Sequence, residues 1–325
     1  MITTAFIGSK DNELLNFYYE TFTAWRRERF PDDAQPVIID NWQEQGSIRS
    51  VLNESDPAVL LSFVPMSSTD LCCKQLQRSN KTLFFAPPLD TSIQAKKDLR
   101  KRCKKDRLSV GTLWPFRFSS GLAKLKEITE SFALGNLREI EITLADIDSR
   151  LLSGRDAEQN SGGKAGFKVR TVMHLLDCAH WLLPSETEQN ISGISITGHN
   201  DHEITISWQT ERAEPISLTL SQKKSEGSAL SVKVSGECGQ VRYDTPVSLT
   251  SDGRGKVIRR ISDNLSQRKN PSPIATPAER PLYNCFNLMQ VSMHDNICFD
   301  CFFRPAADVV YESTYQILAC LSHEK

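Results

Sequence analysis

Residues 2–25 read ITTAFIGSKDNELLNFYYETFTAW, and this stretch decides how the chain begins to fold. Its first seven residues are a short apolar run, which predicts a β-strand. After the polar residues 9–13, apolar side chains recur at the spacing of one helix face, at Leu14, Leu15, Tyr18, Phe22 and Trp25. The stretch therefore predicts a strand, a turn at Gly8 and a helix.

The same alternation continues outward from this stretch as far as residue 118. Further strands are predicted at residues 36–39, 58–65, 82–86 and 109–113, with helices at residues 67–79 and 91–107. Strands that alternate with helices form a parallel sheet with helices on both faces. We therefore expect residues 1–118 to form a Rossmann-like domain of the nucleotide-binding type.

The pattern changes after residue 118. Helices are predicted over residues 121–132 and 168–183, with a strand at residues 138–145 between them, and a last helix near residues 306–322. Residues 191–261 hold short alternating segments separated by turns, which indicate an antiparallel sheet. Residues 119–325 are therefore expected to form a C-terminal α+β domain with a large, mainly antiparallel sheet.

The composition argues against several classes of protein. A chain of 325 residues favours two domains, and its net charge of -1 gives no field that attracts nucleic acid. No apolar run approaches the ~20 residues that cross a bilayer. The first residues lack a signal peptide, and nine cysteines then fit reduced thiols. We expect a cytoplasmic protein that binds neither membranes nor nucleic acid.

Four further segments carry short motifs in a consistent order. They are KTLFFAPPL at residues 81–89, Val110-Gly111 with Arg117-Phe118, ALGNLREI at residues 133–140, and His174-Leu-Leu-Asp177 followed by Trp181-Leu-Leu. They resemble the "GK-x-V-x-x-E-K-P-L", "VG…RF", "G-x-I-G-x-I" and "D-x-G-x-H-x-x-D…WL" motifs of the Gfo/Idh/MocA family, which includes glucose–fructose oxidoreductase and inositol dehydrogenase. This resemblance implies the fold of a nicotinamide-dependent sugar dehydrogenase, with oligomers formed through the open face of the antiparallel sheet.

The nucleotide loop departs from the pattern G-x-G-x-x-G, because residues 8–13 read GSKDNE. The glycines of that pattern let a pyrophosphate approach the backbone at the helix N-terminus. Here Lys10 and Glu13 replace two of them, and we expect Asp11 or Glu13 to cap the helix. Both carboxylates would repel a pyrophosphate, while Lys10 would offset part of that repulsion. Asp40 ends the second strand and is either a ribose ligand or a turn or capping aspartate.

The resemblance also implies catalytic positions, and two of them hold unsuitable residues. Pro87 stands in place of the family's lysine, and Arg170 stands in place of the aspartate four residues before His174. Proline has no titratable group, and arginine stays protonated, so neither exchanges a proton. His174 is either a remnant acid or base or a buried structural histidine. Arg117, Arg170, His174 and Asp177 are the residues that we expect to line a ligand cleft.

Three other groups of residues have simpler explanations. The basic segment 96–107 is a docking strip for nucleic acid or an acidic partner or, more simply, the solvated face of a helix. Cys298 and Cys301 with His294 provide one pair of thiols, whereas structural zinc sites need four ligands, so we expect core cysteines and no metal. Residues 199–202 (HNDH) are predicted to form a hairpin turn.

The sequence thus predicts a degenerate, non-catalytic protein of this family, with no cofactor expected. It would be a scaffold, regulatory subunit or ligand-binding partner of an active paralogue, in a homo- or hetero-oligomer. The alternative is an atypical oxidoreductase acting on a sugar or cyclitol. That enzyme would bind NAD(P) through Gly8, Lys10 and Asp40 and would use His174 with an unidentified partner.

Overall fold

The computed structural model describes residues 3–32, 35–64, 69–76, 81–86, 109–144, 169–184, 191–200, 203–210, 215–222, 230–244 and 248–253, and residues 101, 105, 285, 286, 289, 310, 312, 313, 316 and 317. The chain divides into two compact units. The first is Met1–Pro115 with Ser153–Asn160 and Leu282–Ala306, and the second is Phe116–Leu152 with Ser161–Pro281 and Ala307–Lys325. The two later segments of the first unit have no signal in the sequence, and the boundary at residue 118 stays a prediction.

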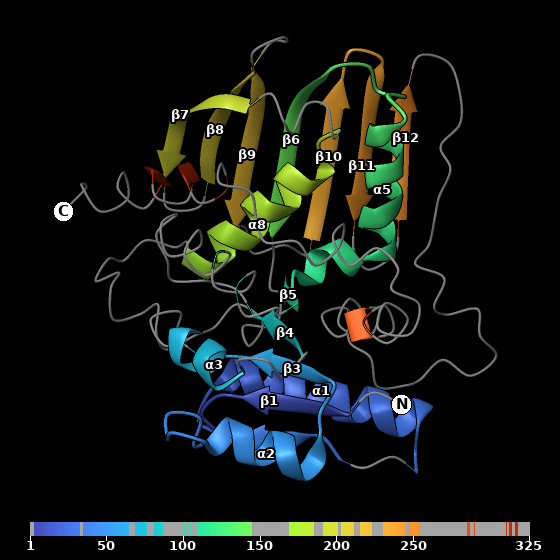
Figure 1. The fold of residues 1–325 in the computed structure, drawn as a ribbon. Coiled ribbons are helices and arrows are strands. Elements are labelled where there is room, and N and C mark those ends of the chain that lie inside the picture. Colours follow the sequence, from blue (N-terminus) through green and yellow to red (C-terminus); the bar gives the residue numbers. More distant parts are fainter. Residues whose placement is uncertain are drawn as a thin grey trace. The chain divides into compact units, whose positions relative to one another are not determined.

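The first unit contains a five-stranded sheet in the order β2-β1-β3-β4-β5, with every neighbouring pair parallel. Its strands are β1 (Thr4–Ile7), β2 (Val37–Ile39), β3 (Val59–Ser62), β4 (Thr82–Phe85) and β5 (Ser109–Thr112). The helices α1 (Glu13–Arg29), α2 (Ser47–Ser55) and α3 (Thr69–Gln75) lie in the connections (Figure 1). The predicted Rossmann-like parallel sheet is confirmed, whereas α2 was not predicted, because only Ile48 and Leu52 of this short helix are buried.

The core of the first unit is built from aromatic rings on β1 and α1. All four residues of β1, β3 and β4 are buried, as expected for strands covered on both faces. The ring of Phe6 lies 5.6 Å from that of Phe22 and 6.0 Å from that of Phe63. Phe22 and Trp25 also contact Phe286, far along the chain. The predicted apolar face of α1 is therefore the face that packs inward.

The second unit contains a seven-stranded sheet in the order β12-β11-β10-β6-β9-β8-β7. Its strands are β6 (Leu137–Leu144), β7 (Ile191–Asn200), β8 (Glu203–Thr210), β9 (Ile216–Gln222), β10 (Leu230–Gly236), β11 (Gly239–Asp244) and β12 (Ser248–Gly253). The pair β6–β9 is parallel and the other pairs are antiparallel. The helices α5 (Ser120–Glu130) and α8 (Val169–Leu182) pack on one face (Figure 1). The mainly antiparallel sheet is thus confirmed.

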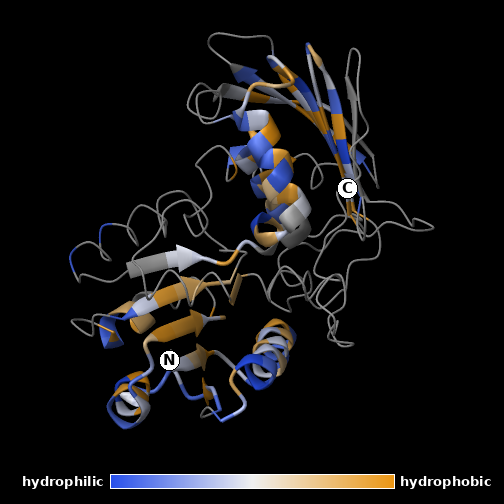
Figure 2. Cartoon of the chain, turned by 90° about the vertical axis from the view of Figure 1, so that its right-hand side faces the viewer, coloured by the Kyte–Doolittle hydropathy of each residue, from blue (hydrophilic) through white to orange (hydrophobic). Residues whose placement is uncertain are grey.

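The two faces of this sheet differ sharply in character. Along its strands hydrophobic and hydrophilic residues alternate (Figure 2). In β6, Ile140, Ile142 and Leu144 are buried, while Glu139 and Glu141 between them are partly exposed. In β8 to β11 the residues that alternate with the buried ones are all serine, threonine, glutamine or charged residues. The face turned away from the buried residues is therefore hydrophilic across the five central strands.

Several smaller predictions meet the structure only in part. Strand β7 extends through His199 to Asn200, so these two residues belong to the strand and not to the predicted turn. The described residues between 310 and 317 are helical, with Val310, Ser313 and Ile317 buried, in agreement with a last helix. Among the described residues no helix is both long and apolar enough to cross a membrane.

The basic segment and the cysteine pair fall largely outside the described residues. Lys101 and Lys105 are helical and exposed, and the rest of residues 96–107 is not described. His294, Cys298 and Cys301 also lie outside the described residues. Within the described part of the chain, no group of three or more His, Cys, Asp or Glu side chains could hold a metal ion.

Candidate functional site

The strand order of the first unit places a potential ligand crevice at the end of β1. The chain adds β2 on one side of β1 and β3, β4 and β5 on the other side. Open α/β sheets bind ligands at such a reversal, outside the carboxyl ends of the strands. Gly8 follows β1, Asp40 follows β2, and Phe63 follows β3. These three residues therefore mark the place where a dinucleotide would bind.

Gly8 is required here by close packing. Its φ is +156°, and a Cβ atom at this position would lie 2.8 Å from Leu15 Cδ1 and 3.2 Å from Phe63 Cβ. Its N–H donates to the Ile39 carbonyl at 3.2 Å. The residue thus makes the tight turn from β1 into α1, which is the part that the first glycine plays in dinucleotide loops.

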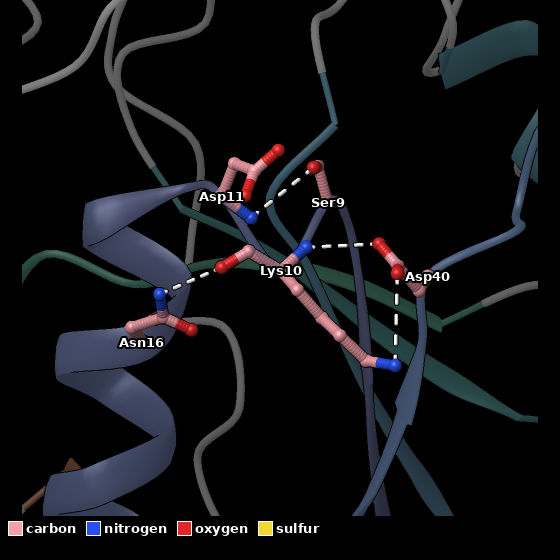
Figure 3. A network of polar contacts seen from close by, with 5 residues as sticks. All are labelled: Ser9, Lys10, Asp11, Asn16 and Asp40. Carbon is pink, nitrogen blue, oxygen red and sulfur yellow. Dashed lines mark hydrogen bonds and ion pairs between the residues drawn. The ribbon is translucent and has the colours of Figure 1, made fainter.

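The backbone N–H groups of residues 10–12 donate to acceptors within the protein, and Figure 3 shows the first two of these hydrogen bonds. The Lys10 N–H donates to Asp40 Oδ1 at 2.9 Å, and the Asp11 N–H donates to Ser9 Oγ at 3.2 Å. The Asn12 N–H donates to the Ser9 carbonyl at 3.0 Å. Three consecutive N–H groups therefore have internal acceptors, whereas a dinucleotide-binding loop directs such groups at the pyrophosphate.

The N-terminus of α1 is capped by Asn12. Its side-chain oxygen accepts hydrogen bonds from the N–H groups of Leu14 at 3.0 Å and Leu15 at 3.2 Å. Its amide group donates to the Phe63 carbonyl at 3.2 Å, which joins the helix start to the end of β3. The expectation that Asp11 or Glu13 caps the helix is wrong, because Glu13 is the first helical residue and the capping position falls on Asn12.

Both carboxylate oxygens of Asp40 face Lys10. Oδ1 accepts from the Lys10 N–H, and Oδ2 lies 3.6 Å from Lys10 Nζ (Figure 3). The side chains of Lys10 and Asp40 are 66% and 41% exposed, so solvent screens the ion pair. On the other side of the loop, Asn16 donates to the Lys10 carbonyl at 2.8 Å. Lys10 and Asp40, both proposed from the sequence as cofactor ligands, therefore bind each other.

The loop after Asp40 is also held from within. The side chain of Gln75 donates to the carbonyls of Trp42 at 3.1 Å and Glu44 at 3.3 Å, and it accepts from the Ile48 N–H at 3.1 Å. Trp42 is buried.

Two residues that order this crevice, Asn12 and Gln75, were not predicted from the sequence. Asn12 had a usable signal, since asparagine is among the strongest N-cap residues, whereas no local signal identified Gln75.

The fold implies a dinucleotide as cofactor, and the residues of this crevice do not fit that group. The donors of Lys10, Asp11 and Asn12 already have acceptors, and Asp40 already accepts from Lys10. Glu13 places a carboxylate in the first turn of α1, where a pyrophosphate would need the positive end of the helix dipole.

The second unit brings together two of the predicted cleft residues. Arg117, in the 3-10 helix η2 (Pro115–Phe118), donates through Nε to Asp177 Oδ2 at 2.9 Å and through Nη2 to Asp177 Oδ1. Both side chains are only 3% exposed. Two parallel hydrogen bonds of this kind are the strongest arrangement of an arginine and a carboxylate. Arg117 and Asp177 therefore join η2 to α8.

His174 lies one turn before Asp177 on α8 and is buried. Its ring contacts that of Phe116 edge-on, with centroids 5.8 Å apart and an interplanar angle of 77°.

Burial raises the pKa of the neighbouring Cys178 thiol far above its usual range, and the Asp177 carboxylate raises it further while Arg117 lowers it. Because the thiolate is the reactive form, Cys178 is unsuited to act as a nucleophile.

The remaining predicted site residues are less completely placed. Arg170 lies in the first turn of α8, but its side chain is outside the described part of the chain. Pro87 is also outside it.

The far end of α8 is held by α5, because Lys126 Nζ donates to the Leu183 carbonyl and Thr129 Oγ1 donates to the Leu182 carbonyl. Residues 172–183 are all buried.

Neither protein-family models nor curated protein sequences yield a match to this chain. Solved structures do, and they are two-domain oxidoreductases of the Rossmann type. They confirm the fold that the resemblance to the Gfo/Idh/MocA family implies.

Three of these structures illustrate the likeness. An oxidoreductase from Sinorhizobium meliloti has a TM-score of 0.65 at 12% identity, covering 99% of this chain and 96% of the other. Levoglucosan dehydrogenase, in complex with NADH and levoglucosan, has a TM-score of 0.63 at 13% identity, covering 99% and 95%. An inositol dehydrogenase homolog from Azotobacter vinelandii, complexed with NAD+, has a TM-score of 0.62 at 12% identity, covering 99% and 94%.

Proposed function

We propose that this protein is a non-catalytic member of the Gfo/Idh/MocA family that has kept the dehydrogenase fold and lost dinucleotide chemistry. One observation carries the proposal. The N–H groups of Lys10, Asp11 and Asn12 are bound within the chain, and Asp40 accepts from Lys10. A dinucleotide would have to break these contacts before it formed its own.

The residues at the family's catalytic positions support the same proposal. Pro87 and Arg170 cannot exchange a proton under working conditions, and a general acid or base typically contributes a rate factor of ~10²–10⁴. His174 is buried beside Phe116, and Asp177 is held by Arg117. Losing both the lysine and the aspartate is expected to remove most of the rate enhancement even if a substrate binds.

The role that remains is that of a scaffold or regulatory subunit for an active paralogue. The partner surface that we propose is the hydrophilic face of the seven-stranded sheet, against the same face of a chain with the same fold. That face presents both signs of charge, with Glu139 and Glu141 beside Lys233. A polar face suits a hydrated interface that dissociates, since obligate interfaces are more hydrophobic.

The first experiment is a titration of the purified protein with NADH and NADPH, followed by calorimetry and cofactor fluorescence. We expect no binding at millimolar cofactor, with an active dehydrogenase measured in parallel as the positive control. Micromolar binding to this protein would refute the proposal.

The second candidate is an atypical NAD(P)-dependent oxidoreductase acting on a sugar or cyclitol. It is favoured by the likeness of nearly the whole chain to dehydrogenases solved with NADH or NAD+, and by Gly8 at the first glycine position. If the titration shows binding, a substrate screen with a His174→Ala control is the next step. Turnover that disappears in this variant would establish the second candidate.

A further inference from the structure

We infer that the loop 9–12 and Asp40 act as a built-in replacement for the dinucleotide, which holds the crevice in one state whatever the supply of nicotinamide. The inference rests on the proposed function and adds its regulation. The protein would be a constitutive partner and not a sensor of the NAD+/NADH ratio.

In a dehydrogenase of this fold a dinucleotide joins the loop after β1 to the end of β2. Its pyrophosphate takes hydrogen bonds from the loop after β1, and its ribose donates to an acidic residue at the end of β2. Here Lys10 joins the same two places. Its N–H donates to Asp40 Oδ1 at 2.9 Å, and its Nζ lies 3.6 Å from Asp40 Oδ2. One residue of the loop thus supplies donors on both its backbone and its side chain to the acidic residue.

The end of β3 is joined to the same loop by Asn12. Asn12 caps α1 through its side-chain oxygen and donates from its amide nitrogen to the Phe63 carbonyl at 3.2 Å. The ends of β1, β2 and β3 are therefore joined by two side chains, Asp40 and Asn12, through loop 9–12. Asn16 closes the arrangement by donating to the Lys10 carbonyl at 2.8 Å.

The loop after β2 is also held by hydrogen bonds within the chain. Gln75 makes three hydrogen bonds to residues 42–48 of this loop and of the start of α2. Hydrogen bonds within the chain thus hold the crevice on both sides of Asp40.

A regulatory consequence follows from these contacts. A ligand shifts a conformational equilibrium only as far as its affinity differs between the two states. The ordered state of this crevice already exists and its donors are already bound. NAD+ and NADH would therefore shift its conformational equilibrium little. Association with a partner would therefore not depend on the NAD+/NADH ratio.

Hydrogen exchange of the full-length protein tests the inference. Amide exchange would be followed in peptides covering residues 8–16 for the native protein and for Asp40→Ala, with and without millimolar NADH. We expect faster exchange at residues 10–12 in Asp40→Ala, on the order of tenfold at the Lys10 amide, which loses its acceptor. NADH should leave the native protein unchanged. Asp32→Ala, an exposed aspartate in the same unit, is the matched control.

A second variant protects the test against misfolding. Asp40→Asn keeps a side-chain oxygen for the Lys10 N–H and removes the charge that attracts Lys10 Nζ, so its effect should be intermediate. Unchanged exchange at residues 8–16 in both Asp40 variants would overturn the inference, whereas the proposed function is tested separately by the cofactor titration. Slower exchange of the native loop on adding NADH would overturn both.

Discussion

The loop after β1 and the middle of α8 are the two regions where a dehydrogenase of this fold would carry its chemistry, and here polar contacts within the chain hold each of them in a different way. In the first unit these are many short-range contacts, mostly to the backbone, around the exposed pair Lys10 and Asp40. In the second unit the contact is one bidentate pair, Arg117 and Asp177, whose side chains are 3% exposed.

The comparison shows that a pair of a basic and an acidic side chain contributes differently to stability when it is exposed and when it is buried. An exposed ion pair contributes ~0–1 kcal/mol, because water and salt screen it. A buried pair contributes little net stability over an apolar pair of equal size, yet removing one partner leaves an uncompensated charge in the interior. The first region should therefore tolerate substitution of either member of its charged pair, while the second should depend strongly on each member of its pair.

The largest effect is expected for Asp177→Ala. The variant leaves the Arg117 guanidinium buried without its carboxylate, and we expect the free energy of unfolding to fall by about 3–5 kcal/mol. Urea unfolding followed by circular dichroism would measure the loss. Mass-spectrometric thiol labelling would show which unit loses stability. The buried Cys178 of the second unit should become reactive before the buried Cys72 and Cys73 of the first.

The double variant Arg117→Met with Asp177→Leu is the control for that experiment. Replacing both charges with apolar groups of similar size should recover most of the lost stability, because well-packed apolar residues often match or exceed a buried ion pair. A double variant as unstable as Asp177→Ala would show that the pair matters for reasons other than its charge.

The next largest effect is expected for Gly8→Ala. The added methyl group would lie 2.8 Å from Leu15 Cδ1 and 3.2 Å from Phe63 Cβ, so the Leu15 side chain must move and Phe63 must give way by a few tenths of an ångström. Overpacking of this kind costs about 1–3 kcal/mol in thermal or urea unfolding. Gly46→Ala is a matched control, because Gly46 also has a positive φ, of +90°, but its Cβ would meet nothing within 4 Å. Equal losses in the two variants would assign the cost to the backbone and not to crowding.

The fold of both regions could be predicted from the sequence, because it follows from local periodicity. The apolar spacing from Leu14 to Trp25 defined α1, and strand–helix alternation defined the parallel sheet. The parallel neighbours β6 and β9 could not be predicted, since pairing across 70 or more residues leaves no local pattern.

The candidate site was harder to predict, because its contacts depend on where side chains meet. Lys10, Asp40, Arg117 and Asp177 were all singled out from the sequence as candidate ligands for other molecules, with a turn or capping role as the alternative for Asp40. Their partners turned out to be each other, at separations of 30 and 60 residues. A charged residue at a motif position shows which chemistry is available there, and only the three-dimensional arrangement shows whether that chemistry is already used.

A smaller effect is expected for Asn12→Ala, which removes the cap of α1. Loss of an N-cap side chain costs ~1 kcal/mol, and the hydrogen bond to the Phe63 carbonyl is lost with it. Asn12→Asp separates the two roles, because a carboxylate still accepts from Leu14 and Leu15 but cannot donate to Phe63. We expect Asn12→Asp to retain most of the stability in urea unfolding. A loss equal to that of Asn12→Ala would assign the stabilisation to the contact with β3 instead.

The smallest effect is expected for Lys10→Ala, and it tests the comparison most directly. The variant keeps the backbone N–H that donates to Asp40 and removes only the ammonium group, which is 3.6 Å from the carboxylate in an exposed pair. Unfolding should become easier by no more than about 1 kcal/mol at low salt. The difference from the native protein should shrink as salt rises and the screening length falls below ~10 Å. A loss of several kcal/mol that persists at high salt would mean that the first region, like the second, depends on a charge protected from solvent.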